Sequence, residues 1–196
     1  MPSDDILQDQ DEYRLGEKMD NAIARLPIQE HLLIEQMEGV FPEQENDLQC
    51  FAHVLDIACG TGTWAVEVAH KNPHIEVVGL ERYPQLVHYA AHLAESQGVE
   101  NASFALLSDE QIRLPFPNGF FDLVNARFLF TLLRTEEWPE FVKECLRVIR
   151  PGGYLRLIEP EWGATSSPAF ERFKELFLRG LKRTGHGLSL DEKHIG

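Results

Sequence analysis

An aspartate within a short apolar run is followed closely by two glycines, and this spacing suits a small charged ligand. Residues 54–58 (VLDIA) have the apolar character of a strand that is covered on both faces. Gly60 and Gly62 then allow a sharp backbone turn and leave room for a ligand to lie against it. The carboxylate of Asp56 would repel a pyrophosphate but attract an ammonium group. The turn is therefore expected to bind a ligand that carries positive charge.

The glycine spacing by itself leaves the type of nucleotide open. Gly60, Gly62 and Ala65 also fit the dinucleotide pattern G-x-G-x-x-G/A. Glu81 lies 19 residues beyond Gly62, at the end of a second predicted strand, where an acid can accept hydrogen bonds from ribose hydroxyls. Glu81 therefore indicates a ribose without naming the cofactor, and its structural alternative is a solvated loop acid.

Strands and helices alternate from residue 54 onward, which is the pattern of a parallel sheet with helices on both faces. Apolar positions at helical spacing between residues 13 and 37 predict two leading helices, or one helix that is kinked at Pro27. The expected strands are 54–58, 76–81, 102–107, 121–126 and 154–158, and the expected later helices are 62–71, 84–97, 136–149 and 169–183.

The composition is that of a globular enzyme domain with an acidic surface. The chain has 196 residues, of which 43% are hydrophobic, and its formal net charge is −14. Such a charge repels a nucleic-acid backbone, so no nucleic-acid partner is expected. No apolar run approaches the roughly 18 residues that would span a membrane, and no signal peptide is seen, which predicts a cytoplasmic protein without a membrane partner. The widely spaced Cys50, Cys59 and Cys145 are typical of reduced thiols.

Three segments resemble motifs of class I S-adenosylmethionine-dependent methyltransferases. The sequence D-x-A-C-G-T-G from Asp56 resembles their first motif, residues 114–122 resemble their LPF…FD segment, and residues 146–153 resemble their L-x-PGG turn. The resemblance covers about residues 54–160 and is to small-molecule enzymes of the ubiquinone-biosynthesis type. It implies a Rossmann-like, doubly wound α/β fold. It also implies methyl transfer from S-adenosylmethionine to an oxygen, nitrogen or carbon nucleophile of a small molecule, with S-adenosylhomocysteine as product.

The resemblance also implies which residues contact the cofactor. Asp56 would bind the amino group, and Glu81 would accept hydrogen bonds from the ribose. Asp109 would accept one from adenine, with Glu110 or the backbone of Gln111 as the alternatives. For Asp56 the structural alternative is a cap of the turn or of the helix that follows. The complete implied set is Asp56, Ala58, Gly60, Gly62, Glu81, Arg82, Ser108, Asp109, Asn125 and Tyr13.

The acceptor site is less legible, because loops and leading helices build it. Arg127, Glu159 and Trp162 are the candidates, and a surface salt bridge is the alternative role for Arg127. No metal site is expected, since His88 and His92 share a helix face without a third ligand. No general base is assigned, because the other histidines lie outside the motifs.

Domain boundaries follow from the same resemblance. Residues 1–12 are expected to form a mobile acidic tail, residues 13–52 a helical lid and linker, and residues 53–196 the cofactor-binding domain. The C-terminal strand hairpin of the family is expected to be missing, because residues 185–196 are too few and too polar to supply it.

Two other functions remain open at this point. One is an NAD(P)-binding oxidoreductase, which the glycine spacing permits. The other is a catalytically silent scaffold that keeps the fold only for interaction. The acceptor and the oligomeric state are left open.

Overall fold

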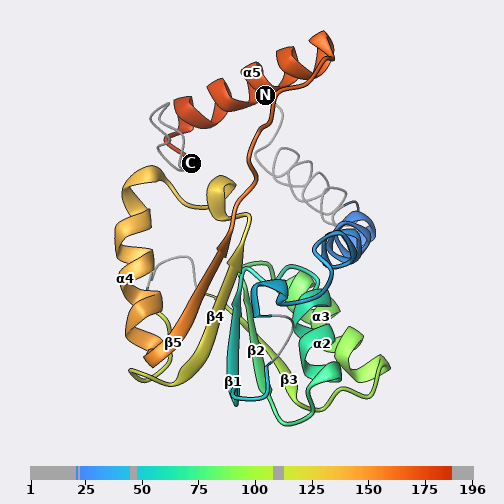
Figure 1. The fold of residues 1–196 in the computed structure, drawn as a ribbon, viewed down its shortest axis with the longest axis vertical. Helices are drawn as coiled ribbons and strands as arrows, with labels where there is room; N and C mark the ends of the chain where they lie inside the picture. The colour runs from blue at the N-terminus through green and yellow to red at the C-terminus, as the bar shows by residue number, and fades with distance from the viewer. Residues whose placement is uncertain (1–20, 22, 45–47, 108–112, 187–196) are drawn as a thin grey trace, which may run out of the picture. The chain divides into compact units, whose positions relative to one another are not determined.

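The computed structural model describes residues 21, 23–44, 48–107 and 113–186. The chain divides into two compact units, residues 1–108 and 109–196, and each is described by itself (Figure 1).

The first unit holds three parallel strands, β1 (His53–Ile57), β2 (Glu76–Glu81) and β3 (Ala102–Leu106), with β2 in the middle. They agree with the three predicted strands to within one residue at each end. Asp56 pairs with Gly79, and Glu81 pairs with Leu106. Parallel pairing places the carboxyl ends of these strands at one edge of the sheet, and β1 and β2 end there in the residues predicted to bind a ligand.

Two helices connect these strands, α2 (Thr63–Lys71) and α3 (Pro84–Ser96), and both lie against them. Gly62 is the N-cap of α2, and Pro84 stands in the first turn of α3, where its missing N–H costs nothing. Gly98 follows α3 with φ 66°, as expected of a helix stop. The helix ends are thus set by local sequence.

The leading segment is one helix over residues 23–36 that runs unbroken through Pro27. The alternative of two separate helices is therefore wrong for this stretch. A proline removes one helical hydrogen bond, but tertiary packing of a helix face can outweigh that cost. Beyond this helix, Phe41, Leu48 and Phe51 are buried, and the Trp64 indole donates a hydrogen bond to the carbonyl of Val40 at 2.9 Å.

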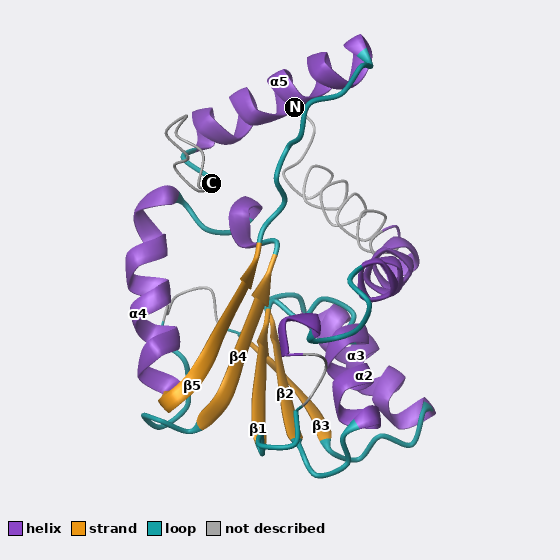
Figure 2. Cartoon of the chain, in the orientation of Figure 1, coloured by secondary structure: helices purple, strands orange, loops and turns teal. Residues whose placement is uncertain are grey.

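The second unit pairs β4 (Phe121–Arg127) in parallel with β5 (Ile149–Ile158), and α4 (Trp138–Val148) packs beside β5 (Figure 2). The prediction that residues 151–153 only end a helix is wrong, because β5 already begins at Ile149. The register shifts from Phe121↔Ile149 to Leu123↔Tyr154, so these residues form a bulge within the strand. A Cβ on Gly153 would lie 2.7 Å from the carbonyl oxygen of Asp122, which explains the glycine there.

The LPF segment is held by α4. Arg147 donates hydrogen bonds to the carbonyls of Leu114 at 2.9 Å and Phe116 at 2.8 Å. Glu144 accepts from the Leu114 N–H at 2.7 Å and pairs with Arg147 at 2.6 Å. Two of the three sequence motifs thus meet through one arginine–glutamate pair, which we call the α4 clamp.

The last described helix is α5 (Pro168–Thr184), which Ser167 caps and after which Gly185 adopts φ 73°. The short helices η2 (Leu129–Thr131) and η3 (Thr135–Glu137) lie between β4 and α4, and η1 (Pro42–Gln44) precedes β1. Up to residue 186, no named strand follows β5 in the described chain. None of the described helices is both long and apolar enough to cross a membrane.

Candidate functional site

The turn after β1 adopts an unusual backbone conformation. Ala58, Gly60 and Gly62 have φ values of 55°, 57° and 73°, so every second residue is left-handed. This conformation costs a residue with a Cβ of the order of 1 kcal/mol, and Ala58 bears that cost. Strain that is kept at the end of a buried strand is typical of a functional turn.

The glycine at position 62 is required by packing. A Cβ there would lie 2.6 Å from the Cβ of Ala90 and 2.8 Å from the ring of Phe104. Helix α3 and strand β3 therefore approach this turn as closely as a glycine allows. Contact of Gly62 with a ligand stays a prediction, and the packing supplies a second reason for the residue.

Glu81 points back to the turn from the end of β2. Its Oε2 accepts from the Gly60 N–H at 2.9 Å, and its Oε1 accepts from the N–H groups of Arg82 at 2.7 Å and Tyr83 at 3.2 Å. The residue is only 4% exposed, which excludes the solvated loop acid. Burial raises the pKa of Glu81, and the three backbone hydrogen bonds partly oppose this rise.

Asp56 is completely buried on β1, two residues before the turn. Its carboxyl group therefore belongs to the interior of the first unit, on the strand that leads into the glycines. The prediction that it binds an amino group is compatible with this position and stays a prediction.

A third acid at this turn was not found by sequence reasoning. Glu30, on the leading helix, is buried, and its Oε2 accepts from the Trp64 N–H at 3.3 Å. Its Oε1 lies 3.2 Å from the place that a Cβ on Gly60 would take. A signal was present in the sequence, because Glu30 interrupts the apolar stripe of Leu26, Leu33 and Met37 at helical spacing.

Carboxylates therefore accept from two of the backbone amides that a phosphate could use at this turn. Two N–H groups around the turn, those of Gly60 and Trp64, donate to Glu81 and Glu30. A third, that of Gly62, donates to the carbonyl of Cys59 at 2.9 Å. A diphosphate needs free amides at a helix N-terminus and would meet negative charge here. The geometry favours a ligand that has cationic groups and hydroxyls.

The remaining predicted contacts of the first unit fall into two groups. Arg82 follows Glu81 directly, and its guanidinium lies 5.5 Å from the ring centroid of Tyr83. Ser108 and Tyr13 lie outside the described residues, as does Asp109 at the start of the second unit. Their predicted roles toward adenine and in a lid stay predictions.

In the second unit, two predicted residues lie on β4. Asn125 is fully buried, and its Oδ1 accepts from Arg156 at 3.1 Å. Arg127 is 8% exposed, so a solvated surface salt bridge is excluded. A cofactor contact of Asn125 and an acceptor contact of Arg127 stay predictions.

The other two acceptor candidates have structural partners. Glu159 accepts from the N–H groups of Leu129 at 2.8 Å and Phe130 at 3.1 Å, and so it caps η2. Burial raises the pKa of Glu159. Trp162 packs against three rings of α5, at centroid distances of 5.3 to 6.3 Å, namely Phe170, Phe173 and Phe177. Their predicted contact with an acceptor remains untested.

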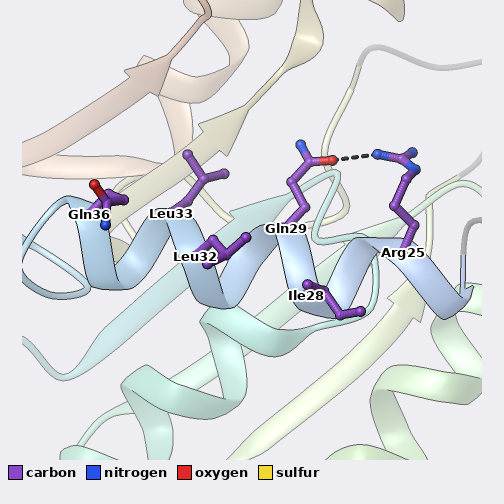
Figure 3. A pocket seen from close by; sticks show the side chains of 6 residues that line it. All are labelled: Arg25, Ile28, Gln29, Leu32, Leu33 and Gln36. Carbon is purple, nitrogen blue, oxygen red and sulfur yellow. Dashed lines mark hydrogen bonds between the residues drawn. The ribbon is translucent and has the colours of Figure 1, made fainter.

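A second surface feature, on the leading helix, has no carboxylate in its lining. A shallow groove follows the leading helix, where Ile28 and Leu32 are exposed and Arg25 bonds to Gln29 (Figure 3). Its lining consists of Arg25, Ile28, Gln29, Leu32, Leu33 and Gln36. Among the described residues, no three histidine, cysteine, aspartate or glutamate side chains are grouped to hold a metal.

Comparison with known proteins gives the family context. A family described as "Methyltransferase domain" matches residues 54–153. A demethylmenaquinone methyltransferase from Deinococcus radiodurans is 35% identical over 106 residues, which are 54% of this chain and 42% of that protein. The chain spans half or less of the length of such curated relatives.

Solved structures agree on the fold. The YcgJ protein from Bacillus subtilis is 26% identical with a TM-score of 0.54, over 72% of this chain and 57% of that chain. Coclaurine N-methyltransferase, solved with N-methylheliamine and SAH, is 18% identical with a TM-score of 0.53, over 63% of this chain and 34% of that chain. The second likeness concerns the fold alone. The predicted Rossmann-like α/β class is thereby confirmed.

Proposed function

Because this chain belongs to the methyltransferase-domain family, we propose that its glycine turn binds S-adenosylmethionine for methyl transfer to a small molecule. The observation that carries the proposal is that carboxylates accept hydrogen bonds from backbone N–H groups that a phosphate would otherwise use. Glu81 and Glu30 accept from the N–H groups of Gly60 and Trp64. Asp56, four residues before Gly60 in the sequence, is completely buried. No comparable feature favours a dinucleotide.

The residues of the first unit fit the chemical groups of this cofactor. When bound, S-adenosylmethionine supplies a methyl group on a positively charged sulfur, which is already an activated leaving group. Glu81 would accept a hydrogen bond from a ribose hydroxyl, since its Oε2 accepts from the Gly60 N–H and has a second acceptor position. Asp56 would attract the amino group, and the backbone of Ala58, Gly60 and Gly62 would lie along the ligand.

The protein's contribution to the reaction is alignment and exclusion of water. Holding the methyl acceptor in line with the donor can supply several kcal/mol of the barrier. A closed cleft strengthens the electrostatic contacts of the buried acids. The acceptor is an oxygen, nitrogen or carbon nucleophile, and no general base is assigned.

The acidic surface supports a small-molecule acceptor rather than a nucleic acid. At a formal net charge of −14, approach to a phosphate backbone is unfavourable. A cytoplasmic location belongs to the same proposal.

Calorimetry on the full chain tests the cofactor. S-adenosylhomocysteine should bind and raise the melting temperature, whereas NAD should do neither. Glu81→Gln should weaken S-adenosylhomocysteine about tenfold or more, because a charged acceptor is lost. Glu76→Gln, at the exposed opposite end of β2, is the matched control and should bind normally.

Transfer is tested with a methyl-labelled donor and a panel of phenols, quinols, amines and acidic carbon compounds. Label in one acceptor class would establish both the activity and the nucleophile. NAD binding at the turn would instead favour the oxidoreductase. Cofactor binding without transfer to any acceptor would favour the silent scaffold.

A further inference from the structure

Helix α5 has an apolar face that the described chain leaves about half exposed. Apolar residues recur there at spacings of three and four, so they share one side of the helix, namely Phe170, Phe173, Leu176 and Phe177. Phe170 is 44% exposed, Phe173 53% and Leu176 50%. None of the 17 residues of α5 is buried by the part of the chain that the structure describes. An amphipathic helix normally buries its apolar side, because packing of that side provides most of its stability.

The rings on this side form one aromatic cluster. Phe173 stacks on Phe177 at a centroid distance of 5.9 Å, and Phe170 lies 6.2 Å from Phe173. Trp162, on the segment before the helix, contacts all three rings, and Phe130 lies 6.2 Å from Phe177. The rings cover one another only in part, since Phe170 and Phe173 remain exposed. An exposed apolar patch of this kind is typical of an interaction surface.

The polar side of α5 has a charge opposite to that of the whole chain. The helix holds five basic and two acidic side chains, whereas the full sequence has a formal net charge of −14. Each of the two acids pairs with a cation of the helix itself at 2.7 Å. Lys182 and Arg183 follow in the last turn. Cations there also stabilise a helix end, but that role requires no aromatic face.

We propose that α5 binds the surface of a membrane that contains anionic lipid. The aromatic face would lie among the headgroups, and the basic side chains would lie beside the lipid phosphates. Aromatic and leucine side chains on one face, with Lys and Arg on the other, are the signature of a helix that lies in the plane of a membrane surface. Such a helix does not span the bilayer, so the expectation of no membrane partner, which rests on spanning segments, does not apply to it.

Electrostatics favours lipid over a second copy of this chain. Self-association through α5 would bring basic helices side by side, which is unfavourable. Repulsion between an anionic surface and the acidic remainder of the chain falls off over about 8 Å at physiological ionic strength. The cations of α5 would lie at the surface itself, where attraction is strongest. The proposal concerns α5 alone and does not depend on the cofactor.

Co-sedimentation of the full chain with lipid vesicles tests the proposal. Vesicles of phosphatidylcholine with about 30% phosphatidylserine should bind the protein at least about tenfold more tightly than vesicles of phosphatidylcholine alone. Salt at about 1 M should weaken this binding, because it shortens the Debye length to about 3 Å. Tryptophan emission should shift to the blue on binding. The shift would report Trp162, since Trp64 and Trp138 are already buried.

A double variant of the aromatic face locates the apolar contact. Phe170→Ser with Phe173→Ser should lower binding at least about tenfold, because two large apolar side chains are lost from the interface. The matched control is Ile28→Ser with Leu32→Ser, which removes two exposed apolar side chains from the leading helix. The control should bind the vesicles normally.

A double variant of the last turn locates the charge. Lys182→Gln with Arg183→Gln should lower binding to the anionic vesicles about tenfold. The matched control is Lys71→Gln with Lys143→Gln, which removes the same charge from exposed side chains of α2 and α4. The control should leave binding unchanged, and circular dichroism of every variant checks the fold.

Three results would overturn the proposal. One is that the unaltered protein does not bind the anionic vesicles, and another is that the α5 variants and their controls lose binding equally. The third is dimerisation without lipid that Phe170→Ser with Phe173→Ser abolishes, because a second copy would then cover α5. Binding of S-adenosylhomocysteine is measured separately and decides only the proposed function.

Discussion

Two buried glutamates accept hydrogen bonds from backbone N–H groups, but their pKa values shift in opposite directions. Glu144 in the α4 clamp accepts from Leu114, and Arg147 holds its pKa below the usual range. Glu81 at the glycine turn accepts from three backbone N–H groups, yet burial raises its pKa. Glu144, which binds the LPF segment, has a cationic partner within the chain, Arg147. For the acid at the turn, desolvation dominates, so polar groups of a ligand can improve its environment.

The largest expected effect comes from packing at the turn. Gly62→Val should destabilise the protein by about 3 kcal/mol, because the side chain would enter the space of Ala90 and Phe104 at a left-handed φ. Urea unfolding measures the change. Gly98→Val is the control, since nothing lies within 4 Å of its added Cβ and only backbone strain remains. Equal losses at both positions would show that packing at the turn is unimportant.

Substitution by glutamine should lower stability at Glu144 and ligand affinity at Glu81. Glu144→Gln should cost about 1.5 kcal/mol of stability, because the charged hydrogen bonds to Arg147 are lost, while ligand affinity stays unchanged. Glu81→Gln should change stability by less than about 1 kcal/mol, because removal of a buried charge offsets a lost hydrogen bond. Its S-adenosylhomocysteine affinity should fall instead. Urea unfolding and calorimetry of both variants measure this, and a stability loss only at Glu81 would contradict the comparison.

Acid titration sharpens the contrast further. Since the pKa of Glu144 is lowered by folding, its contribution to stability is present above the unfolded value near 4.5 and is lost as pH falls through the folded pKa. The pH dependence of the Glu81 contribution has the opposite sign. Because folding raises its pKa, its contribution to stability is present below the unfolded value and is lost as pH rises through the folded pKa.

Unfolding free energies measured between pH 3 and 7 should therefore differ in slope between the variants. Glu144→Gln should flatten the loss of stability toward acid, and Glu81→Gln should steepen it. Identical slopes in both variants and the unaltered protein would remove the electrostatic basis of the contrast.

The smallest expected effect concerns the cysteines of the two units. Burial is the main cause that raises the pKa of Cys145 to about 12, and Cys59 at the turn is completely buried. Cys50 is exposed. At pH 8 a thiol reagent should therefore modify one cysteine rapidly in the native protein and three after denaturation. Peptide mapping should locate the fast label at Cys50, and a fast label at Cys59 would indicate that the turn opens readily.

Local sequence was enough to locate most elements. Apolar runs and helix-stop residues placed β1, β2 and β3 to within one residue. For β1 and β2 the reason is burial, because a strand covered on both faces has few alternatives. The parts that failed depended on contacts far along the chain. Residues 151–153 carry turn signals, yet pairing with β4 draws them into a bulged strand. At Pro27 only the alternative of two separate helices failed, because the helix is continuous there.

The sequence by itself determined the glycine turn and the fold class, and it located Asp56 and Glu81 within strands that end at that turn. These features follow from periodicity and from motifs that occupy contiguous residues. Only the tertiary structure brought Glu30 to Gly60 and Trp64, and only it showed that packing against Ala90 and Phe104 excludes a side chain at Gly62. Those contacts join residues up to 42 positions apart. Their geometry depends on how helices pack on strands, which spacing along the chain does not specify.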